Sequence, residues 1–121
     1  MYRIGTDIID ISRIKKSLSN ENFKIRVFSK NEISMIDKKK NPYESYAGNW
    51  AAKEAFSKAL GTGVRGFALT EVEVLRNELG KPYIKLSGNA KAASDGFYFD
   101  VSISHTSTLA TATVIAYKED K

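Results

Sequence analysis

The segment that most constrains the fold spans residues 50–63 and reads WAAKEAFSKALGTG. Its alanines and aromatic residues predict a mostly buried helix, which ends at Gly61 because glycine readily takes a left-handed conformation. Glu54 and Lys58 are one turn apart on the same face of this helix. Such a pair can serve solubility alone. In these apolar surroundings, however, the carboxylate of Glu54 needs a partner, and a metal ion is one.

The composition predicts one globular domain. The chain has 121 residues, of which 42% are hydrophobic and 27% are charged, as in folded rather than disordered proteins. We expect a single domain over residues 1–121, short enough that association between copies would help to stabilise it. The formal net charge of +5 favours anionic partners, which include nucleic acid, phosphorylated cofactors and acidic proteins.

Several protein classes are disfavoured. No apolar run is long enough to cross a bilayer, and Thr6, Asp7 and Asp10 interrupt the N-terminus too early for a secretory signal. Cysteine is absent, which excludes disulfides, a thiolate nucleophile and a zinc–thiolate site. We therefore expect a cytoplasmic protein with no membrane partner.

Helices are predicted early in the chain and strands late. A strand over residues 3–9 precedes helices over 11–18, 31–38 and 43–60. Asp10, a capping box of Ser29 and Glu32, and Asn41 with Pro42 mark the starts of these helices. Further on, the alternation of apolar residues predicts strands over 68–76, 82–86, 98–104 and 109–117, with a short helix over 89–93. The expected class is α+β, with a mainly antiparallel sheet packed against the long helix.

Three glycines after the long helix resemble a dinucleotide-binding fingerprint. Gly61, Gly63 and Gly66 spell G-x-G-x-x-G. That fingerprint requires a strand before it and a helix after it, whereas here a helix precedes and a strand follows, which argues against a Rossmann site. Taken alone, the glycines either end the helix or let backbone N–H groups approach an anion.

Two further residues are candidates for chemistry. Asp7, at the end of the first predicted strand, either caps the next helix or works as a functional carboxylate; paired with Glu54 beside a phosphate, it would make a magnesium site. His105 is the only histidine and follows residues 101–104 at the tip of a predicted hairpin. No G-x-S-x-G elbow supports a serine triad, so we favour a histidine that donates to a phosphate or orders the hairpin. A single histidine without cysteine argues against zinc.

Three blocks in family order resemble the small bacterial holo-[acyl-carrier-protein] synthases, which are 4′-phosphopantetheinyl transferases. They are residues 4–14 (IGTDIIDISRI), 50–63 (WAAKEAFSKALGTG) and 101–106 (VSISHT), and Gly80-Lys81-Pro82 matches the family's hairpin. The resemblance implies the fold of that family. It also implies transfer of the 4′-phosphopantetheine arm of coenzyme A to a serine of apo acyl carrier protein, which releases adenosine 3′,5′-bisphosphate.

The resemblance also implies roles for individual residues. Asp7 and Glu54 would hold Mg²⁺ against the coenzyme A pyrophosphate, and Lys58 would stand beside the reacting phosphate. Contacts to coenzyme A are implied for Lys53, Lys58, Gly61, Gly63, His105 and Thr106. Contacts to the acidic carrier protein are implied for Arg13, Lys16 and Arg26. A homotrimer is implied, with coenzyme A bound between adjacent subunits.

One position departs from the family pattern, and one role stays open. The family pattern has arginine at position 49, where this chain has asparagine, so the positive charge would come from Lys53 or from one of residues 38–40. The proton acceptor would be Glu54 through a bound water or Lys58 with a lowered pKa, and the sequence does not choose between them.

A basic module that binds nucleic acid is the alternative from another class. The net charge supports it, and aromatic residues could stack on bases. Those aromatic residues lie at core spacing rather than among the lysines, which argues against this alternative.

Overall fold

The computed structural model describes every residue except 62, 64, 120 and 121. Its elements in chain order are β1 (Tyr2–Asp10), α1 (Ile11–Leu18), α2 (Glu21–Val27), α3 (Lys30–Asp37), α4 (Pro42–Leu60), the 3₁₀ helix η1 (Leu69–Glu71), β2 (Val72–Arg76), β3 (Pro82–Leu86), α5 (Gly88–Ala93), β4 (Tyr98–His105) and β5 (Leu109–Tyr117). The predicted α+β class and its long helix are confirmed. Within the described residues, no helix is long and apolar enough to cross a membrane.

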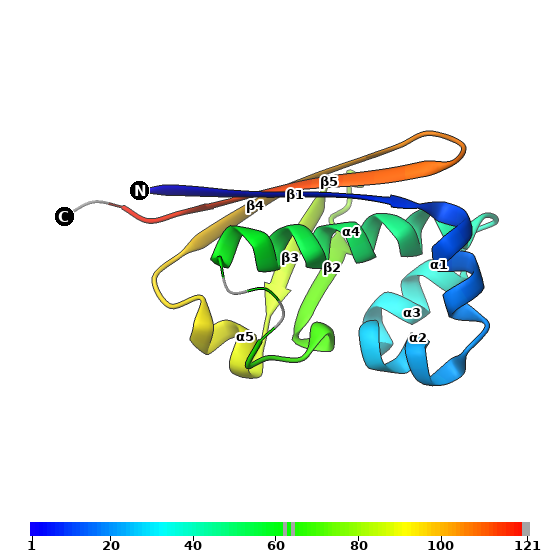
Figure 1. Ribbon diagram of the computed structural model, residues 1–121, viewed down its shortest axis with the longest axis horizontal. Helices are drawn as coiled ribbons and strands as arrows, with labels where there is room; N and C mark the ends of the chain where they lie inside the picture. Colours follow the sequence, from blue (N-terminus) through cyan, green and yellow to red (C-terminus); the bar gives the residue numbers. More distant parts are fainter. Residues whose placement is uncertain (62, 64, 120–121) are drawn as a thin grey trace.

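Among the described residues, five strands form two antiparallel sheets rather than one. The larger sheet has the order β1-β5-β4, so the first and last strands of the chain are neighbours and the two termini lie at the same end (Figure 1). β2 and β3 form a separate hairpin that packs against α4, with β3 next to β4 of the larger sheet. An exposed ion pair between Lys81 and Asp100, 3.0 Å long, joins the hairpin to β4 without backbone pairing.

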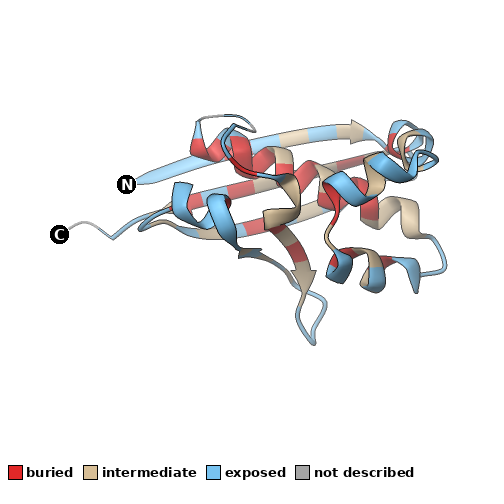
Figure 2. Cartoon of the chain, turned by 90° about the horizontal axis from the view of Figure 1, so that it is seen from below, coloured by how far each residue is buried: buried red, intermediate tan, exposed pale blue. Residues whose placement is uncertain are grey.

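Helix α4 covers one face of the larger sheet, and small residues make this contact close. The face of β5 toward the helix consists of alanines and one valine, all at most 1% exposed: Ala110, Ala112, Val114 and Ala116. They meet alanines of α4, of which Ala51, Ala52 and Ala55 have no exposed surface. Figure 2 shows this buried surface running along α4 and the strands beside it. The helix is therefore a fixed support for side chains on either side of it.

The opposite face of the larger sheet is open to solvent. It carries large apolar side chains that are 40–80% exposed, namely Tyr2, Ile4, Ile8, Tyr98 and Ile115. The strand register aligns Tyr2, Tyr117 and Tyr98 in one row across the sheet, and Thr6, Thr113 and Ser102 in another. This surface is called the open face below. Exposed apolar side chains gathered on one face are typical of a surface that contacts another molecule.

The helical end of the molecule contains one helix that the sequence reading missed. α2 begins after Asn20, whose Oδ1 accepts hydrogen bonds from the backbone N–H groups of Asn22 (2.9 Å) and Phe23 (3.4 Å). The capping box of Ser29 and Glu32 is confirmed. Asp10 and Asn41 precede their helices as predicted, but neither side chain caps the backbone.

The predicted strand over residues 68–76 is wrong in its first part. η1 occupies Leu69–Glu71, and pairing with β3 begins only at Val72. The carboxylate of Glu71 accepts hydrogen bonds from the backbone N–H groups of Ala68 (2.9 Å) and Asn89 (3.1 Å). These bonds hold the chain in a turn, which side-chain alternation alone does not reveal.

Candidate active site

Asp7 and Lys58 meet where β1 crosses the last turns of α4. The ammonium of Lys58 lies 3.1 Å from Oδ1 of Asp7 and donates a second hydrogen bond, of 2.9 Å, to the carbonyl oxygen of Thr6. The expectation that Asp7 ends the first strand is wrong, because β1 pairs with β5 as far as Asp10. Asp7 therefore lies within the part of β1 that pairs with β5, rather than at a strand end from which it could cap a helix.

A close backbone contact brings Asp7 to the helix. Gly5 precedes it by two residues and faces the same way, and a Cβ atom at Gly5 would overlap the carbonyl oxygen of Ala55 and lie 2.6 Å from the nitrogen of Ala59. Only glycine allows this approach. The strand therefore lies directly on the helix, and Asp7 reaches the turn that carries Glu54 and Lys58.

Glu54 is half-buried and shares this site with Asp7. Burial raises the pKa of the Glu54 carboxyl, the negative charge of Asp7 raises it further, and Lys58 opposes both effects. Two carboxylates that repel one another in a partly buried site favour a bound cation. Among the described residues, no three His, Cys, Asp or Glu side chains form a metal site. A pair of carboxylates fits Mg²⁺, which takes its other oxygen ligands from water and phosphates, better than it fits a structural zinc site.

Lys53, expected to contact coenzyme A, is fully buried. Its ammonium lies 2.7 Å from Oε1 of Glu32 and donates to the carbonyl oxygens of Leu69 (2.8 Å) and Val72 (2.6 Å). Burial lowers the pKa of Lys53, and the charge of Glu32 opposes that shift. The predicted phosphate contact is wrong, because all three N–H groups bind protein acceptors away from the surface.

Asn49, which stands where the family pattern has arginine, is buried in the same network. Its Nδ2 donates to Oε2 of Glu32 (2.9 Å) and to the carbonyl oxygen of Val74 (3.0 Å). Its Oδ1 accepts a hydrogen bond of 3.2 Å from Arg76. The sequence did not predict that Glu32 and Arg76 belong to this network. Only Glu32 stood out in the sequence, and it did so as part of the capping box with Ser29.

His105 and Thr106 lie at the turn between β4 and β5. Nε2 of His105 is 3.4 Å from Oε2 of Glu44, and Oγ1 of Thr106 accepts from the backbone N–H groups of Thr108 (3.2 Å) and Leu109 (3.0 Å). Thr106 thus orders the turn. His105 borders a polar cleft of about 410 Å³ that Lys39, Glu44, Gly48, Arg76 and Ile103 also line, here called the β4 cleft.

The predicted site residues are divided between two edges of the larger sheet. Asp7 is on β1, His105 is on β4, and β5 separates these two edge strands. Two strand spacings are about 10 Å. The residues of β5 that lie between the two positions are covered by α4.

The glycine turn after α4 has the predicted form where it is described. Gly61 ends the helix with φ of 78°, and Gly63 has φ of 63°. The guanidinium of Arg3 donates to the carbonyl oxygen of Leu60 at 3.2 Å, which ties the end of α4 to β1. Thr62 and Val64 lie outside the described residues.

The chain is similar in sequence to proteins of known family. The 4′-phosphopantetheinyl transferase superfamily matches residues 3–113 of the chain. The chain belongs to this superfamily. Named holo-[acyl-carrier-protein] synthases from Fusobacterium nucleatum and Clostridium botulinum are 46% and 49% identical to it; each alignment spans 93% of this chain, and 95% and 94% of the relatives' lengths. The resemblance read from three sequence blocks is confirmed, and the nucleic-acid alternative has no support.

Solved structures of the same kind share the fold. A holo-(acyl-carrier-protein) synthase from Bacillus anthracis in complex with CoA (3′,5′-ADP) has a TM-score of 0.83 and 34% identity, over 97% of this chain and 96% of that one. The Helicobacter pylori enzyme in complex with coenzyme A has a TM-score of 0.81 and 32% identity, over 94% and 99%. The 4′-phosphopantetheinyl transferase fold is thus found over nearly the whole chain.

In this superfamily member, the basic residues expected to meet a carrier protein lie at the helical end. Arg13 and Lys16 are exposed on α1, and Arg26 is exposed on α2. Among the described residues, no carboxylate forms an ion pair with any of the three. α1 begins directly after β1, so Arg13 and Lys16 are close in the chain to Asp7.

Proposed function

We propose that this chain, acting as one domain over residues 1–121, transfers 4′-phosphopantetheine from coenzyme A to a serine of apo acyl carrier protein. The reaction would serve fatty acid biosynthesis in the cytoplasm. The observation that carries the proposal is the cluster of Asp7, Glu54 and Lys58 in a phosphopantetheinyl transferase fold. Two carboxylates and an ammonium suit phosphoryl transfer, which needs positioning and charge neutralisation more than covalent help.

Asp7 and Glu54 would hold Mg²⁺ against the pyrophosphate of coenzyme A. When bound, Mg²⁺ would neutralise phosphate charge and stabilise the leaving bisphosphate. The like-charge repulsion that raises the pKa of Glu54 supports this assignment, because a cation would relieve it.

The residues of the chain have separate tasks in the proposed step. The serine oxygen attacks the phosphorus that carries the pantetheine arm, and the bond from that phosphorus to the oxygen of adenosine 3′,5′-bisphosphate breaks. Lys58, whose side chain is 55% exposed, would donate to a phosphate oxygen. Glu54 would accept the serine proton through a bound water molecule.

We further propose a homotrimer in which adjacent subunits complete each site. The division of the predicted residues between β1 and β4 supports this arrangement, because one subunit would supply Asp7, Glu54 and Lys58, and its neighbour would supply His105 and the β4 cleft. Gly61, Gly63 and Thr106 would contact the bound coenzyme A from the ends of α4 and β4.

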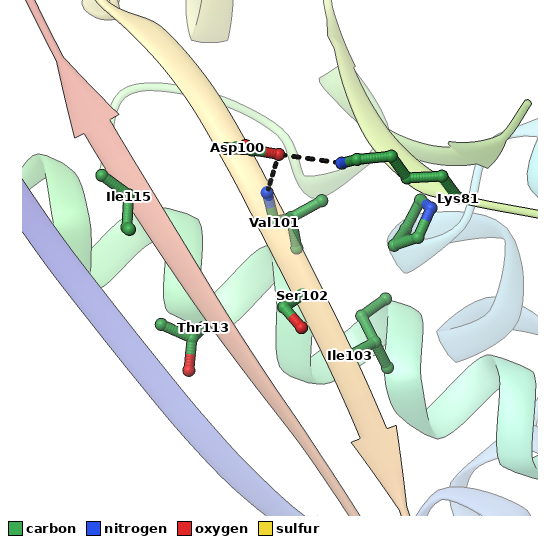
Figure 3. Close-up of a pocket in the computed structure, with 8 residues that line it drawn as sticks. Lys81, Asp100, Val101, Ser102, Ile103, Thr113 and Ile115 are labelled. Atoms are coloured by element: carbon green, nitrogen blue, oxygen red, sulfur yellow. Dashed lines mark hydrogen bonds and ion pairs between the residues drawn. The ribbon is translucent and has the colours of Figure 1, made fainter.

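The open face is the proposed contact between subunits. Its exposed Ile4, Ile8 and Ile115 would be buried there. A hollow of about 380 Å³ at the β4 edge of this face is lined by Ser102, Thr113 and Ile115, whose side chains Figure 3 shows on neighbouring strands. Apolar projections on one copy and a hollow on the same face of another suit mutual packing.

The carrier protein would dock on the helical end. An acidic partner complements the exposed Arg13, Lys16 and Arg26, which have no carboxylate partners within the described part of the chain. Reversing the charge at Arg13 should weaken carrier binding and leave coenzyme A affinity little changed.

The test is formation of holo-carrier from apo acyl carrier protein, coenzyme A and Mg²⁺, followed by intact mass, with and without a chelator. We expect the mass increase only without chelator. Asp7→Ala and Glu54→Ala should abolish it, and the exposed Glu78→Ala should not. Full activity in both site variants would reject the metal assignment, and no mass increase with the unaltered protein would reject the function.

A further inference from the structure

Arg76 is a cation in the β4 cleft that forms no ion pair with a carboxylate within the described part of the chain, although the charge of Glu32 acts on it from a distance. It is the last residue of β2 and is half-buried. Its Nη2 donates to Oδ1 of Asn49 at 3.2 Å, and its Nη1 donates to the carbonyl oxygen of Leu75 at 3.4 Å. A guanidinium has five N–H donors, so most of them remain available to a ligand.

The buried network fixes the position of Arg76 without cancelling its charge. Both amide hydrogens of Asn49 are given to Glu32 and to the carbonyl oxygen of Val74, so its oxygen must face Arg76. Glu32 has its own counter-ion, the ammonium of Lys53 at 2.7 Å. The neutral amide of Asn49 therefore orients Arg76, while the buried carboxylate of Glu32 is already paired with Lys53.

The other charges of the cleft do not remove this imbalance. Lys39 and His105 line the same cleft, and its one carboxylate, Glu44, lies 3.4 Å from Nε2 of His105. Burial lowers the pKa of Arg76, but an arginine side chain stays protonated in proteins. A permanently charged, partly desolvated fork of donors in a cleft matches an anion with several oxygens, and phosphate is the commonest such group on a cofactor.

We propose that Arg76, oriented by Asn49, binds a phosphate at the nucleotide end of coenzyme A. This rests on the proposed function and adds a binding residue to it. The positive charge at this end of the ligand then comes from β2, rather than from Lys53 on α4, which is buried.

The affinity of Arg76→Gln for nucleotides, measured by calorimetry, tests the proposal. The matched control is Lys85→Gln, which removes one exposed charge from the partner strand β3. Losing a charge-assisted hydrogen bond should weaken coenzyme A binding about 10- to 100-fold. The control should change it less than about twofold, because an exposed charge outside the cleft acts only at long range. Arg76→Lys should recover part of the loss, since it keeps the charge but not the fork.

Two further ligands tell which phosphate is bound. If Arg76 binds the 3′-phosphate, Arg76→Gln weakens coenzyme A and adenosine 3′,5′-bisphosphate but not 3′-dephospho-coenzyme A. If it binds the pyrophosphate, coenzyme A and 3′-dephospho-coenzyme A weaken equally. Either result supports the proposal. The proposal is overturned if Arg76→Gln melts at the same temperature as the unaltered protein and binds coenzyme A as tightly as Lys85→Gln does.

If the Arg76→Gln variant unfolds, Arg76→Lys replaces it, and a coenzyme A affinity equal to that of the unaltered protein would overturn the proposal. Failure of the proposed function gives a different pattern, in which the unaltered protein itself binds no coenzyme A. The two failures are therefore distinguishable.

Discussion

The ammonium of Lys58 lies 3.1 Å from Oδ1 of Asp7, a residue 51 positions earlier in the chain. Lys58 thereby provides positive charge at the point where Asp7 and Glu54 repel one another. Asp7 is mostly buried, with 16% of its side chain exposed, whereas the lysine side chain is 55% exposed. The carboxylate is therefore fixed and the ammonium is able to move toward a ligand.

The pKa of Glu54 should respond to both of these neighbours. In Asp7→Asn we expect the Glu54 carboxyl to titrate at lower pH than in the unaltered protein, because one cause of its raised pKa is removed. In Lys58→Met we expect it to titrate at higher pH. Carbon-13 NMR of the Glu54 carboxyl measures both. Identical titration in all three proteins would show that the side chains do not share a site.

The same shift has a consequence for stability. A carboxyl whose pKa is raised on folding stabilises the folded state below its ordinary value of 4.5, and this contribution is lost as pH rises through the raised pKa. We therefore expect the unfolding free energy, measured with urea at several pH values in this window, to change less with pH in Glu54→Gln than in the unaltered protein.

Gly5 should be less tolerant of alanine than Gly48. At Gly5 a Cβ meets the backbone of Ala55 and Ala59, which cannot move without shifting α4. We expect Gly5→Ala to lose about 1–3 kcal/mol of unfolding free energy, as other overpacked sites do, and to lose transferase activity as Asp7 is displaced. At Gly48 the Cβ meets only Cγ2 of Ile103, at 2.9 Å, and a side chain can adjust.

Gly48→Ala is therefore the matched control. It should stay within about 1 kcal/mol of the unaltered protein, because alanine is the better helix former. Equal stability of the two variants, measured by urea unfolding, would contradict the close contact of β1 with α4.

The buried pair of Lys53 and Glu32 should matter for folding rather than for ligand binding. Lys53→Met leaves a buried carboxylate without its counter-ion and should cost about 3–5 kcal/mol. The double variant with Glu32→Gln should cost less than the sum of the single changes, since it removes the uncompensated charge. Urea unfolding tests both points. If the Lys53→Met protein stays folded, it should bind coenzyme A as tightly as the unaltered protein. Strongly weakened binding would indicate that Lys53 contacts the ligand.

If adjacent subunits complete each site, mixed trimers of two inactive variants should regain transferase activity. We would refold Asp7→Ala together with a variant carrying Arg76→Gln and His105→Ala. With equal amounts of the two variants, each half of a site is intact in half of the cases. About a quarter of the sites in randomly mixed trimers therefore combine an intact β1 edge with an intact β4 cleft. Activity near that fraction is the expected result of the mass assay. No recovery, with mixed trimers seen by native mass spectrometry, would place the whole site in one subunit.

The sequence alone determined which local elements form and which acidic and basic residues are candidates for the chemistry. Helix spacing put Glu54 and Lys58 on one face, and Gly61 marked where that helix ends. Glycine, capping and alternation signals act over a few residues, so they are readable without the rest of the chain.

Only the tertiary structure decided what each charged residue faces. Lys53 and Lys58 are about 140° apart around α4, and spacing does not say which of them lies under β2 and which lies beside β1. The buried network puts Lys53 inside and brings Arg76 to the β4 cleft, although they belong to different elements. Burial and ion pairing depend on which segments pack together, and that is set by contacts between residues far apart in the chain.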